Sequence, residues 1–269
     1  MKLSIITINY NHLDGLKRTY ESVVGQTWQD FEWIVIDGGS TDGSREFIEE
    51  HKDWFSYWCS EPDKGVYHAM NKGIAKALGE YLNFMNSGDM FFDSGSLATV
   101  FLKERSADVL YGAMLLADGT LDHEPMMKTR LHWFDFYNNT LPHQASFIRR
   151  ELFARVGSYD ESFRISADWY FFAKAFVRYG ASVEFIPSVL ARFEGGGCSA
   201  DSKIADVENA RFKQDVFGNY LLDNHDRTMY FDVIREYHLL AILHSLLYRM
   251  ACLLNRIRCR KPSISGYNF

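Results

Sequence analysis

Four short apolar runs alternate with three segments of helical character in the first 90 residues, and this alternation constrains the fold more than any other feature. The apolar runs cover residues 2–9 (KLSIITIN), 31–37 (FEWIVID), 54–59 and the stretch that begins at Tyr81. Between them, residues 13–25 and 66–77 carry apolar side chains at helical spacing, and residues 44–52 form a short helix. Strands and helices that alternate in this way build a parallel sheet covered on both faces. We therefore expect an α/β fold with a doubly wound, mostly parallel sheet.

The pattern after residue 90 is less regular. It predicts helices near 97–101, 151–156, 168–176 and 201–217, and strands over 109–116, 143–149, 183–186 and 189–193. Asp118 and Gly119 predict a hairpin turn, whereas residues 123–142 carry no regular pattern. A long, largely apolar stretch over 231–258 predicts a further helix. We expect one domain over residues 1–220 and a helical tail over 221–269.

Composition and charge exclude several classes of protein. The chain has 269 residues, of which 47% are hydrophobic and 24% charged, and these proportions are typical of a soluble globular protein. The net charge of −6 argues against binding to nucleic acid. The cysteines lie far apart without a CxxC pair, which argues against a zinc cluster or a disulfide framework and favours a reducing compartment. With no recognisable signal peptide or membrane span, we expect a cytoplasmic protein.

Polar side chains follow three of the predicted strands at the point where each strand ends. Asn9 closes the first strand, Asp37 closes the second, and residues 86–89 (NSGD) follow the strand that begins at Tyr81. Ligands of open α/β sheets bind at the carboxyl ends of the strands, so these side chains indicate a binding edge. Asp89 is the candidate ligand for Mn²⁺ or Mg²⁺, since these ions take oxygen ligands from carboxylates, water and phosphates. The alternative is that Asp89 only caps the following helix.

Asp168 is a second candidate carboxylate, placed after a strand-like run and at the start of a helix. One acid for a metal and one for proton removal would suit a transfer to a hydroxyl group. The alternative for Asp168 is a helix N-cap, which residue spacing alone favours. The chain contains neither GxxxxGK[ST] nor GxGxxG, so phosphate-binding loops of those kinds have little support.

Eight short motifs, in order along residues 3 to about 200, resemble the family 2 glycosyltransferases, and most closely the branch that builds bacterial O-antigen, capsule and exopolysaccharide. Each motif is weak alone, but eight in sequence make the resemblance specific. The motifs are Ser4–Asn11, Gln26–Thr27, Asp37–Ser44, Ser60–Gly65, Ala69–Gly73, Asn86–Asp89, His143–Gln144 and Ser166–Asp168.

This resemblance implies the GT-A fold, a Rossmann-like sheet, together with a nucleotide-diphosphate sugar donor, one Mn²⁺ or Mg²⁺ ion, and inversion at the anomeric carbon. It implies that Asp89 binds the metal, that Asp168 deprotonates the acceptor hydroxyl, and that His143 lies near the diphosphate or the acceptor. The alternative for His143 is a strand-edge histidine bonded to backbone. The remaining implied donor-binding residues are Asn9, Tyr10, Asp37, Asp63, Asn71, Asn86 and Gly88.

The chain departs from the family pattern at two places. Gly38 stands where many relatives have a second acid, and Asn86–Asp89 stands in place of an Asp-x-Asp-Asp sequence. These departures leave open a non-catalytic protein that binds sugar nucleotides. A sugar-phosphate nucleotidyltransferase is a further alternative, although it would need a basic, glycine-rich loop where this chain has residues 10–14 (YNHLD). A donor with a UDP group is favoured, and the acceptor is a glycan or lipid-linked hydroxyl.

The tail has a charge opposite to that of the rest of the chain. Residues 237–269 contain five basic residues and no acid, which leaves −11 for the rest. An apolar helix with a basic end is typical of a helix that lies on an anionic membrane surface. The alternative is a helix that packs on the catalytic domain or on a partner chain. The four basic residues at the end of the apolar stretch are Arg256, Arg258, Arg260 and Lys261.

Overall fold

The computed structural model describes residues 1–116, 119–122, 126–128, 130–195 and 202–222. The chain divides into two units, Met1–Val216 and Phe217–Phe269. Residues 223–269, which make up most of the second unit and all but the first two residues of the predicted tail, lie outside the described residues. The domain boundary near residue 220 and the tail helix therefore stay predictions.

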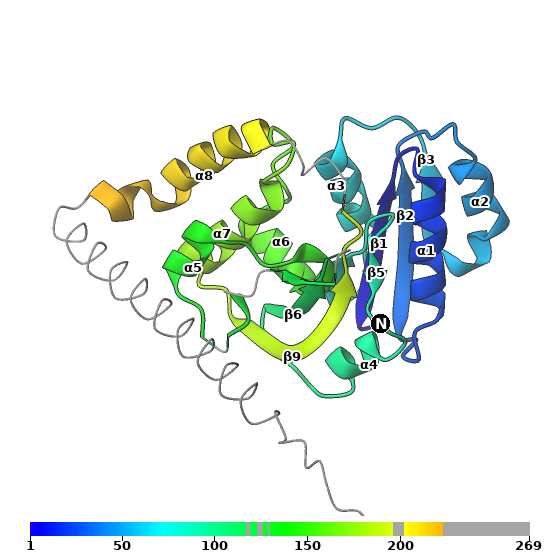
Figure 1. The fold of residues 1–269 in the computed structure, drawn as a ribbon, viewed down its shortest axis with the longest axis horizontal. Coiled ribbons are helices and arrows are strands. Elements are labelled where there is room, and N and C mark those ends of the chain that lie inside the picture. The colour runs from blue at the N-terminus through cyan, green and yellow to red at the C-terminus, as the bar shows by residue number, and fades with distance from the viewer. Residues whose placement is uncertain (117–118, 123–125, 129, 196–201, 223–269) are drawn as a thin grey trace, which may run out of the picture. The chain divides into compact units, whose positions relative to one another are not determined.

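The described chain alternates strands and helices as its sequence predicts (Figure 1). The strands are β1 (Leu3–Asn9), β2 (Phe31–Asp37), β3 (Tyr57–Ser60), β4 (Tyr81–Phe84), β5 (Met90–Phe91), β6 (Val109–Leu115), β7 (Leu121–Asp122), β8 (Ser146–Arg149) and β9 (Val183–Arg192). The α-helices are α1 (Leu13–Val24), α2 (Ser44–Glu50), α3 (Val66–Lys76), α4 (Ser96–Phe101), α5 (Trp133–Asn138), α6 (Arg150–Val156), α7 (Ala167–Tyr179) and α8 (Ser202–Leu222). Two 3₁₀ segments are η1 (Lys52–Trp54) and η3 (His143–Ala145).

The amino-terminal half of the sheet is parallel and covered on both faces. Its strands lie in the order β3-β2-β1-β4, with Asn9 of β1 beside Asp37 of β2. Side chains of β1 alternate between the two faces: Ile5 joins the core beneath α1, whereas Ile6 lies against Gly73 of α3. Figure 1 accordingly shows α1 and α2 on one side of β1 and β2, and α3 on the other. The prediction of a doubly wound α/β sheet is confirmed.

The carboxyl-terminal half of the sheet is mixed. β8 pairs antiparallel with both β4 and β6, and β9 pairs parallel with β6. Residues 183–192 form one strand rather than the two short strands expected around Pro187. Proline cannot donate to the ladder, and here the register of β6 and β9 shifts between Tyr111 and Met114, so the strand continues through an irregularity.

Two further local expectations were wrong. Residues 143–149 begin with the 3₁₀ segment η3 before β8 starts at Ser146, and residues 133–138 form α5 inside a stretch without a sequence pattern. A buried carboxylate explains α5, because Asp135 accepts a hydrogen bond from the backbone N–H of His132 and closes a capping box. Tertiary contacts therefore decide structure where periodicity is weak.

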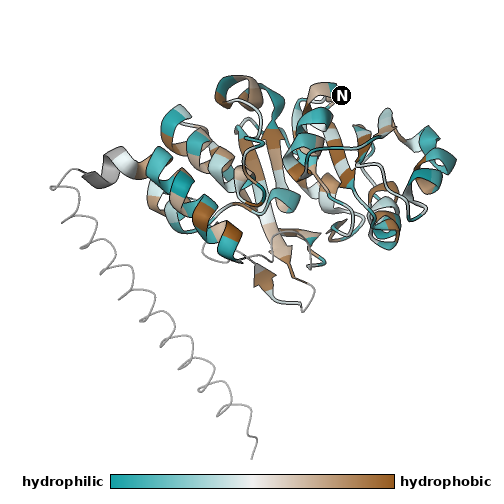
Figure 2. Cartoon of the chain, turned by 90° about the horizontal axis from the view of Figure 1, so that it is seen from above, coloured by the Kyte–Doolittle hydropathy of each residue, from teal (hydrophilic) through white to brown (hydrophobic). Residues whose placement is uncertain are grey.

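Hydrophobic residues concentrate in the strands, whereas the helices carry mixed faces (Figure 2). The largest fully buried side chains include Trp33, Tyr81 and Phe147, which belong to one core cluster around the sheet. Within the described ranges, no helix is both long enough and apolar enough to cross a membrane.

Candidate functional site

The carboxyl ends of β1, β2 and β3 meet around the carboxylate of Asp37. Asn9 donates from Nδ2 to one carboxylate oxygen at 2.7 Å, and Ser60 donates to the other at 2.6 Å. The Ser40 hydroxyl lies 2.5 Å from Asp37 Oδ1, and its backbone N–H also donates to the carboxylate. Burial disfavours an anion here, but these hydrogen bonds together outweigh it and keep the pKa of Asp37 below its usual value. Asp37 is thus ionised, fully buried and saturated with hydrogen bonds, so it holds the strand ends in place, and its role in donor binding stays a prediction.

Tyr10 and Asp63 flank the backbone directly after Asp37. A side chain at Gly38 would place its Cβ 2.7 Å from Asp63 Oδ2 and 3.1 Å from Tyr10 Cδ2, so only glycine fits without movement. Tyr10 is 66% exposed, which leaves its ring face open to a ligand. Asp63 therefore brings a second carboxylate close to the end of β2, beside Gly38, which stands where many relatives have a second acid.

Asn71, on α3, bonds to the loop that contains Tyr159. Its amide donates to the carbonyl of Tyr159 at 2.9 Å and accepts from the N–H of Tyr159 at 3.0 Å, so both ends of the amide hold one loop. A second hydrogen bond from Nδ2 reaches Glu161 at 3.0 Å. These contacts account for Asn71 structurally, and its role in donor binding stays a prediction.

The turn over Asn86–Asp89 is fastened to α1. The N–H of Gly88 donates to Thr19 Oγ1 at 3.0 Å, and the Thr19 hydroxyl donates to the carbonyl of Asp89 at 2.7 Å. Gly88 has φ of +101°, a conformation that side chains rarely adopt. Asp89 is followed by β5 rather than by a helix, so the helix-cap alternative is wrong.

The Asp89 side chain is buried beneath this turn, with 4% of the residue exposed. Burial raises the pKa of Asp89 to about 6, although the nearby His143 and hydrogen bonds from the Gln144 side chain and the Glu194 backbone favour the anion. At neutral pH the carboxylate is thus ionised in a place that disfavours isolated negative charge. Such a site favours a cation beside it.

Oxygen atoms without hydrogen-bond partners gather at the same turn. Within the described part of the chain, Asn86 Oδ1, Ser87 Oγ and Glu194 Oε2 are buried without a hydrogen-bond partner, although Glu194 Oε2 lies 3.9 Å from His12 Nε2. Glu194 Oε2 would lie 2.5 Å from a Cβ on Gly88, and its other oxygen pairs with Arg18. Hard oxygen donors suit Mg²⁺ and Mn²⁺, so these residues fit the expected metal. No group of three His, Cys, Asp or Glu side chains at ligand spacing occurs in the described ranges, so substrate oxygens and water would have to complete the coordination.

His143 connects this turn to Asp168. Its Nδ1 lies 3.1 Å from Asp168 Oδ2, and its Nε2 lies 3.3 Å from Asn86 Nδ2. Both partners are side chains, so the alternative of a backbone-bonded strand-edge histidine is wrong. η3 turns the chain just before β8, and this turn points the imidazole between the two polar groups.

Asp168 lies in the first turn of α7 but is not its cap, because the N-cap residue is Ser166. Its Oδ1 accepts a hydrogen bond from the hydroxyl of Tyr67 at 2.9 Å, and its side chain is 14% exposed. Burial disfavours the anion, but His143 and the hydrogen bond from Tyr67 outweigh it and lower the pKa of Asp168. The N-cap alternative is therefore wrong, and the carboxylate is held ionised.

Tyr67 is a residue of the site that the sequence analysis missed. A signal was available, since Tyr67 lies between two of the motifs that carry the family resemblance, Ser60–Gly65 and Ala69–Gly73. In the structure Tyr67 is itself one of the buried residues of α3.

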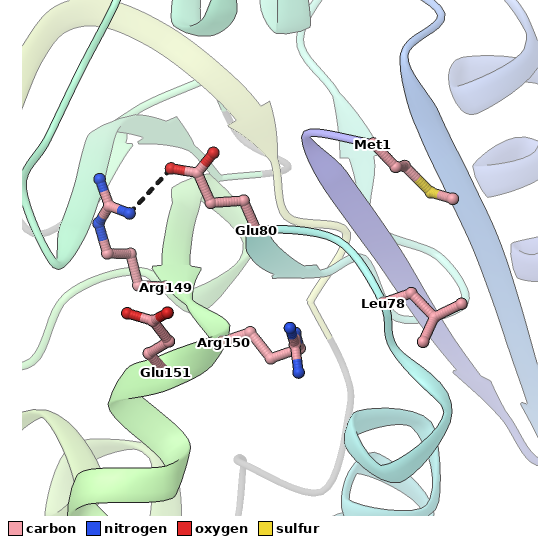
Figure 3. A pocket seen from close by; sticks show the side chains of 6 residues that line it. All are labelled: Met1, Leu78, Glu80, Arg149, Arg150 and Glu151. Atoms are coloured by element: carbon pink, nitrogen blue, oxygen red, sulfur yellow. Dashed lines mark hydrogen bonds and ion pairs between the residues drawn. The ribbon is translucent and has the colours of Figure 1, made fainter.

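A cavity elsewhere in the molecule contains none of these residues (Figure 3). It lies at the amino ends of β1 and β4, whereas the polar groups described above lie at the carboxyl ends. An ion pair between Arg149 and Glu80 occupies part of it, with N and O at 2.8 Å. Its lining residues are Met1, Leu78, Glu80, Arg149, Arg150 and Glu151.

Comparison with known proteins identifies sequence relatives over most of the chain. An uncharacterized glycosyltransferase from Mycobacterium tuberculosis is 40% identical over 178 residues, which is 64% of this chain and 68% of the relative. A "PGL/p-HBAD biosynthesis glycosyltransferase" from Mycobacterium bovis is 32% identical over 220 residues, which is 73% of this chain and 78% of the relative.

Solved structures share the fold at lower sequence identity. S. aureus TarS 1-349 in complex with UDP-GlcNAc gives a TM-score of 0.68 at 19% identity, over 83% of this chain and 68% of that one. The mannosyltransferase PcManGT from Pyrobaculum calidifontis, in complex with GDP-Man and Mn²⁺, gives 0.57 at 18% identity, over 83% and 65%. The chain thus spans about two thirds of the length of these structures.

The match to a family profile settles the classification. The profile described as "Glycosyl transferase family 2" covers residues 4–179, which include the polar edge of the sheet, His143 and Asp168. The chain belongs to glycosyl transferase family 2.

Proposed function

We propose that this protein transfers a sugar from a nucleotide-diphosphate donor, with a UDP-sugar favoured, to a hydroxyl of a glycan or lipid-linked acceptor, with inversion at the anomeric carbon. The observation that carries the proposal is the position of His143, which joins the Asn86–Asp89 turn to the ionised Asp168. A donor-side group and a candidate base thereby lie one side chain apart. The TarS complex with UDP-GlcNAc supports the choice of donor.

The chemistry is a single displacement. The acceptor oxygen forms a bond to the anomeric carbon as its proton passes to Asp168, and the bond from that carbon to the diphosphate breaks with its electron pair. Asp168 retains free lone pairs for this proton, because each of its oxygens accepts only one side-chain hydrogen bond in the described contacts. Attack opposite the leaving group inverts the anomeric centre without a covalent enzyme intermediate.

The donor would lie along the carboxyl ends of β1, β2 and β4. Asp37, fully buried and held by Asn9 and two serines, would fix the strand ends beneath the nucleoside, and the exposed Tyr10 offers a ring face. Asp63 adds a carboxylate beside Gly38. The backbone of Gly88 and the amide of Asn86 would then approach the diphosphate.

A divalent metal, Mn²⁺ or Mg²⁺, would be held at Asp89 beside the oxygens of Asn86 and Glu194 that lack a hydrogen-bond partner. When bound, it would compensate the negative charge that develops on the departing diphosphate. PcManGT, a structural neighbour with GDP-Man and Mn²⁺, supports this choice of metal.

We place the reaction in the synthesis of surface polysaccharide or a related glycoconjugate, on the cytoplasmic face of the membrane. The relative named "PGL/p-HBAD biosynthesis glycosyltransferase" supports a biosynthetic role, while the O-antigen, capsule and exopolysaccharide branch rests on the motif resemblance. The basic tail would hold the enzyme at an anionic membrane surface.

Release of UDP from UDP-GlcNAc tests the activity, assayed with Mn²⁺, with Mg²⁺ and with EDTA, and repeated with GDP- and dTDP-sugars. We expect release that requires a divalent metal and is lost in Asp168→Asn. Asp53→Asn is the matched control, because Asp53 is an exposed acid on η1. Binding of a UDP-sugar without release under any condition would favour a non-catalytic sugar-nucleotide-binding protein instead.

A further inference from the structure

The two oxygens of the Asp168 carboxylate are held by residues from different parts of the chain. Oδ2 faces His143 of η3, and Oδ1 accepts from the hydroxyl of Tyr67 on α3 at 2.9 Å. Tyr67 is 4% exposed, so its hydroxyl cannot exchange this partner for bulk water. The two contacts fix the plane of the carboxylate.

The Tyr67 hydroxyl has a second acceptor within reach, the backbone carbonyl of Ile165. A phenol carries one proton and therefore donates fully to only one of these acceptors at a time. An ionised carboxylate is the stronger acceptor, so the proton lies toward Asp168 while Asp168 is an anion. When the carboxyl becomes neutral, the proton can turn to Ile165 without leaving the oxygen.

We propose that Tyr67 is a positioning residue for the base. Its hydroxyl holds the Asp168 carboxylate ionised and oriented, and turns its proton to the Ile165 carbonyl as Asp168 takes the acceptor proton. The proposal rests on the proposed function, in which Asp168 removes that proton. Tyr67 contacts neither donor nor acceptor in this scheme and acts only through Asp168.

The electrostatic surroundings of Asp168 agree with this geometry. The titratable groups that face it are His143 from η3, Tyr67 from α3 and Tyr159 from the loop after α6; its own helix contributes the N–H of Trp169. The hydrogen bond from Tyr67 lowers the pKa of Asp168. Burial, together with the negative charge of Asp168, raises the pKa of Tyr67, which therefore stays protonated and remains a donor.

Tyr159 provides a matched control at the same place. It is 3% exposed, its ring centroid lies 5.6 Å from that of Tyr67, and it is close enough for the charge of Asp168 to raise its pKa. Its hydroxyl has no hydrogen-bond partner within the described residues. Tyr159→Phe therefore removes the same atom as Tyr67→Phe from the same neighbourhood, but breaks no bond to Asp168.

The test is the pH dependence of kcat for UDP release in the full chain at saturating UDP-GlcNAc and Mn²⁺, because a bound cation would keep Asp89 ionised and its raised pKa would then not set the acid limb. The variants are Tyr67→Phe, Tyr159→Phe, Asp168→Asn and the double variant Tyr67→Phe with Asp168→Asn. In Tyr67→Phe we expect the acid limb to move to higher pH by about one unit, the usual effect of one hydrogen bond to a charged group. We also expect kcat below the limb to fall while KM for the donor stays unchanged. Tyr159→Phe should leave the pH of the acid limb and kcat unchanged. In the double variant, Tyr67→Phe should have no effect beyond that of Asp168→Asn.

Three results would overturn the proposal. If the Tyr67→Phe profile superimposes on that of the wild type while Asp168→Asn is inactive, Tyr67 does not act on the base, and the proposed function stands. If Tyr67→Phe lowers the rate equally at every pH together with the melting temperature, its role is structural only. If Asp168→Asn keeps full activity, the proposed function fails, and the role of Tyr67 fails with it.

Discussion

The Nδ1 atom of His143 lies 3.1 Å from Asp168 Oδ2, while its Nε2 atom lies 3.3 Å from Asn86 Nδ2. In the neutral imidazole that fits these contacts, Nδ1 donates to the carboxylate and Nε2 accepts from the amide. One side chain therefore links the turn proposed for the diphosphate to the group proposed as base. The relationship gives His143 both an electrostatic and a geometric role.

Replacement of His143 by Gln tests the electrostatic role. Burial opposes the charged imidazolium, but Asp168 outweighs it and raises the pKa of His143. A raised histidine pKa stabilises the fold at pH values below the unfolded pKa, and this stabilisation is lost as pH rises through the folded pKa. We expect His143→Gln to lower the free energy of unfolding more at about pH 6 than at about pH 9. Urea denaturation at the two pH values measures this, and an equal loss at both would contradict the pairing.

Asp37→Asn should destabilise the protein at neutral pH. The carboxylate accepts from Asn9, Ser40 and Ser60, and an amide cannot accept from all of them. We expect a loss of roughly 2–3 kcal/mol in the free energy of unfolding, the usual range for bonds to a buried charged group. Because the pKa of Asp37 is lowered, its stabilisation is present above the unfolded pKa and disappears as pH falls through the folded one. Urea denaturation from about pH 7 down to about pH 3 should therefore show the difference shrinking; a constant difference would mean that the charge is unimportant.

Asp89→Asn should stabilise the metal-free protein above about pH 6, whereas Asp37→Asn should destabilise it. Burial raises the pKa of Asp89 to about 6, so the folded state loses stability as pH rises from about 4 to about 6, and Asn avoids this loss. We expect the variant to melt at a higher temperature than the wild type at about pH 8 in EDTA, with no such gain at about pH 4. The variant should also lose the thermal stabilisation that Mn²⁺ gives the wild type in the presence of UDP. If Mn²⁺ stabilises both proteins equally, Asp89 is not the metal ligand.

The tail prediction concerns residues outside the described ranges. Alanine at Arg256, Arg258, Arg260 and Lys261 should weaken co-sedimentation of the full chain with anionic vesicles, by about 1 kcal/mol for each basic residue near the surface. Binding of the wild type should fall with added salt and be absent with neutral vesicles. Equal sedimentation of the two proteins, independent of salt, would indicate a tail that packs on protein.

The sequence predicted those parts of the fold that local pattern controls. The alternation of apolar runs with helical segments predicted the parallel half of the sheet, and strand ends then placed Asn9 and Asp37 side by side. The same argument identified Asp89, but no sequence pattern indicated that its carboxylate would be buried. The position of Asp168 at a helix start made it a candidate carboxylate; the family resemblance added Asp63, His143 and the role of Asp168 as base, but not the contact between His143 and Asp168.

Contacts between distant segments could not be predicted. Asp168 meets His143, 25 residues earlier, and Tyr67, 101 residues earlier. The contact with His143 depends on β8 pairing antiparallel with β4 and β6, and no local periodicity in the sequence predicts that pairing. Spacing favours a helix cap at Asp168, and this interpretation is wrong because the N-cap is Ser166, while the Asp168 carboxylate contacts Tyr67 and His143.

The most direct test of the whole account is Asp168→Asn, measured for UDP-GlcNAc binding by calorimetry and for UDP release in the presence of Mn²⁺. We expect donor affinity like that of the wild type and a rate lower by about 10²–10⁴-fold, the usual contribution of a general base. A variant that loses donor affinity but keeps its turnover would contradict the assignment of Asp168 as the base.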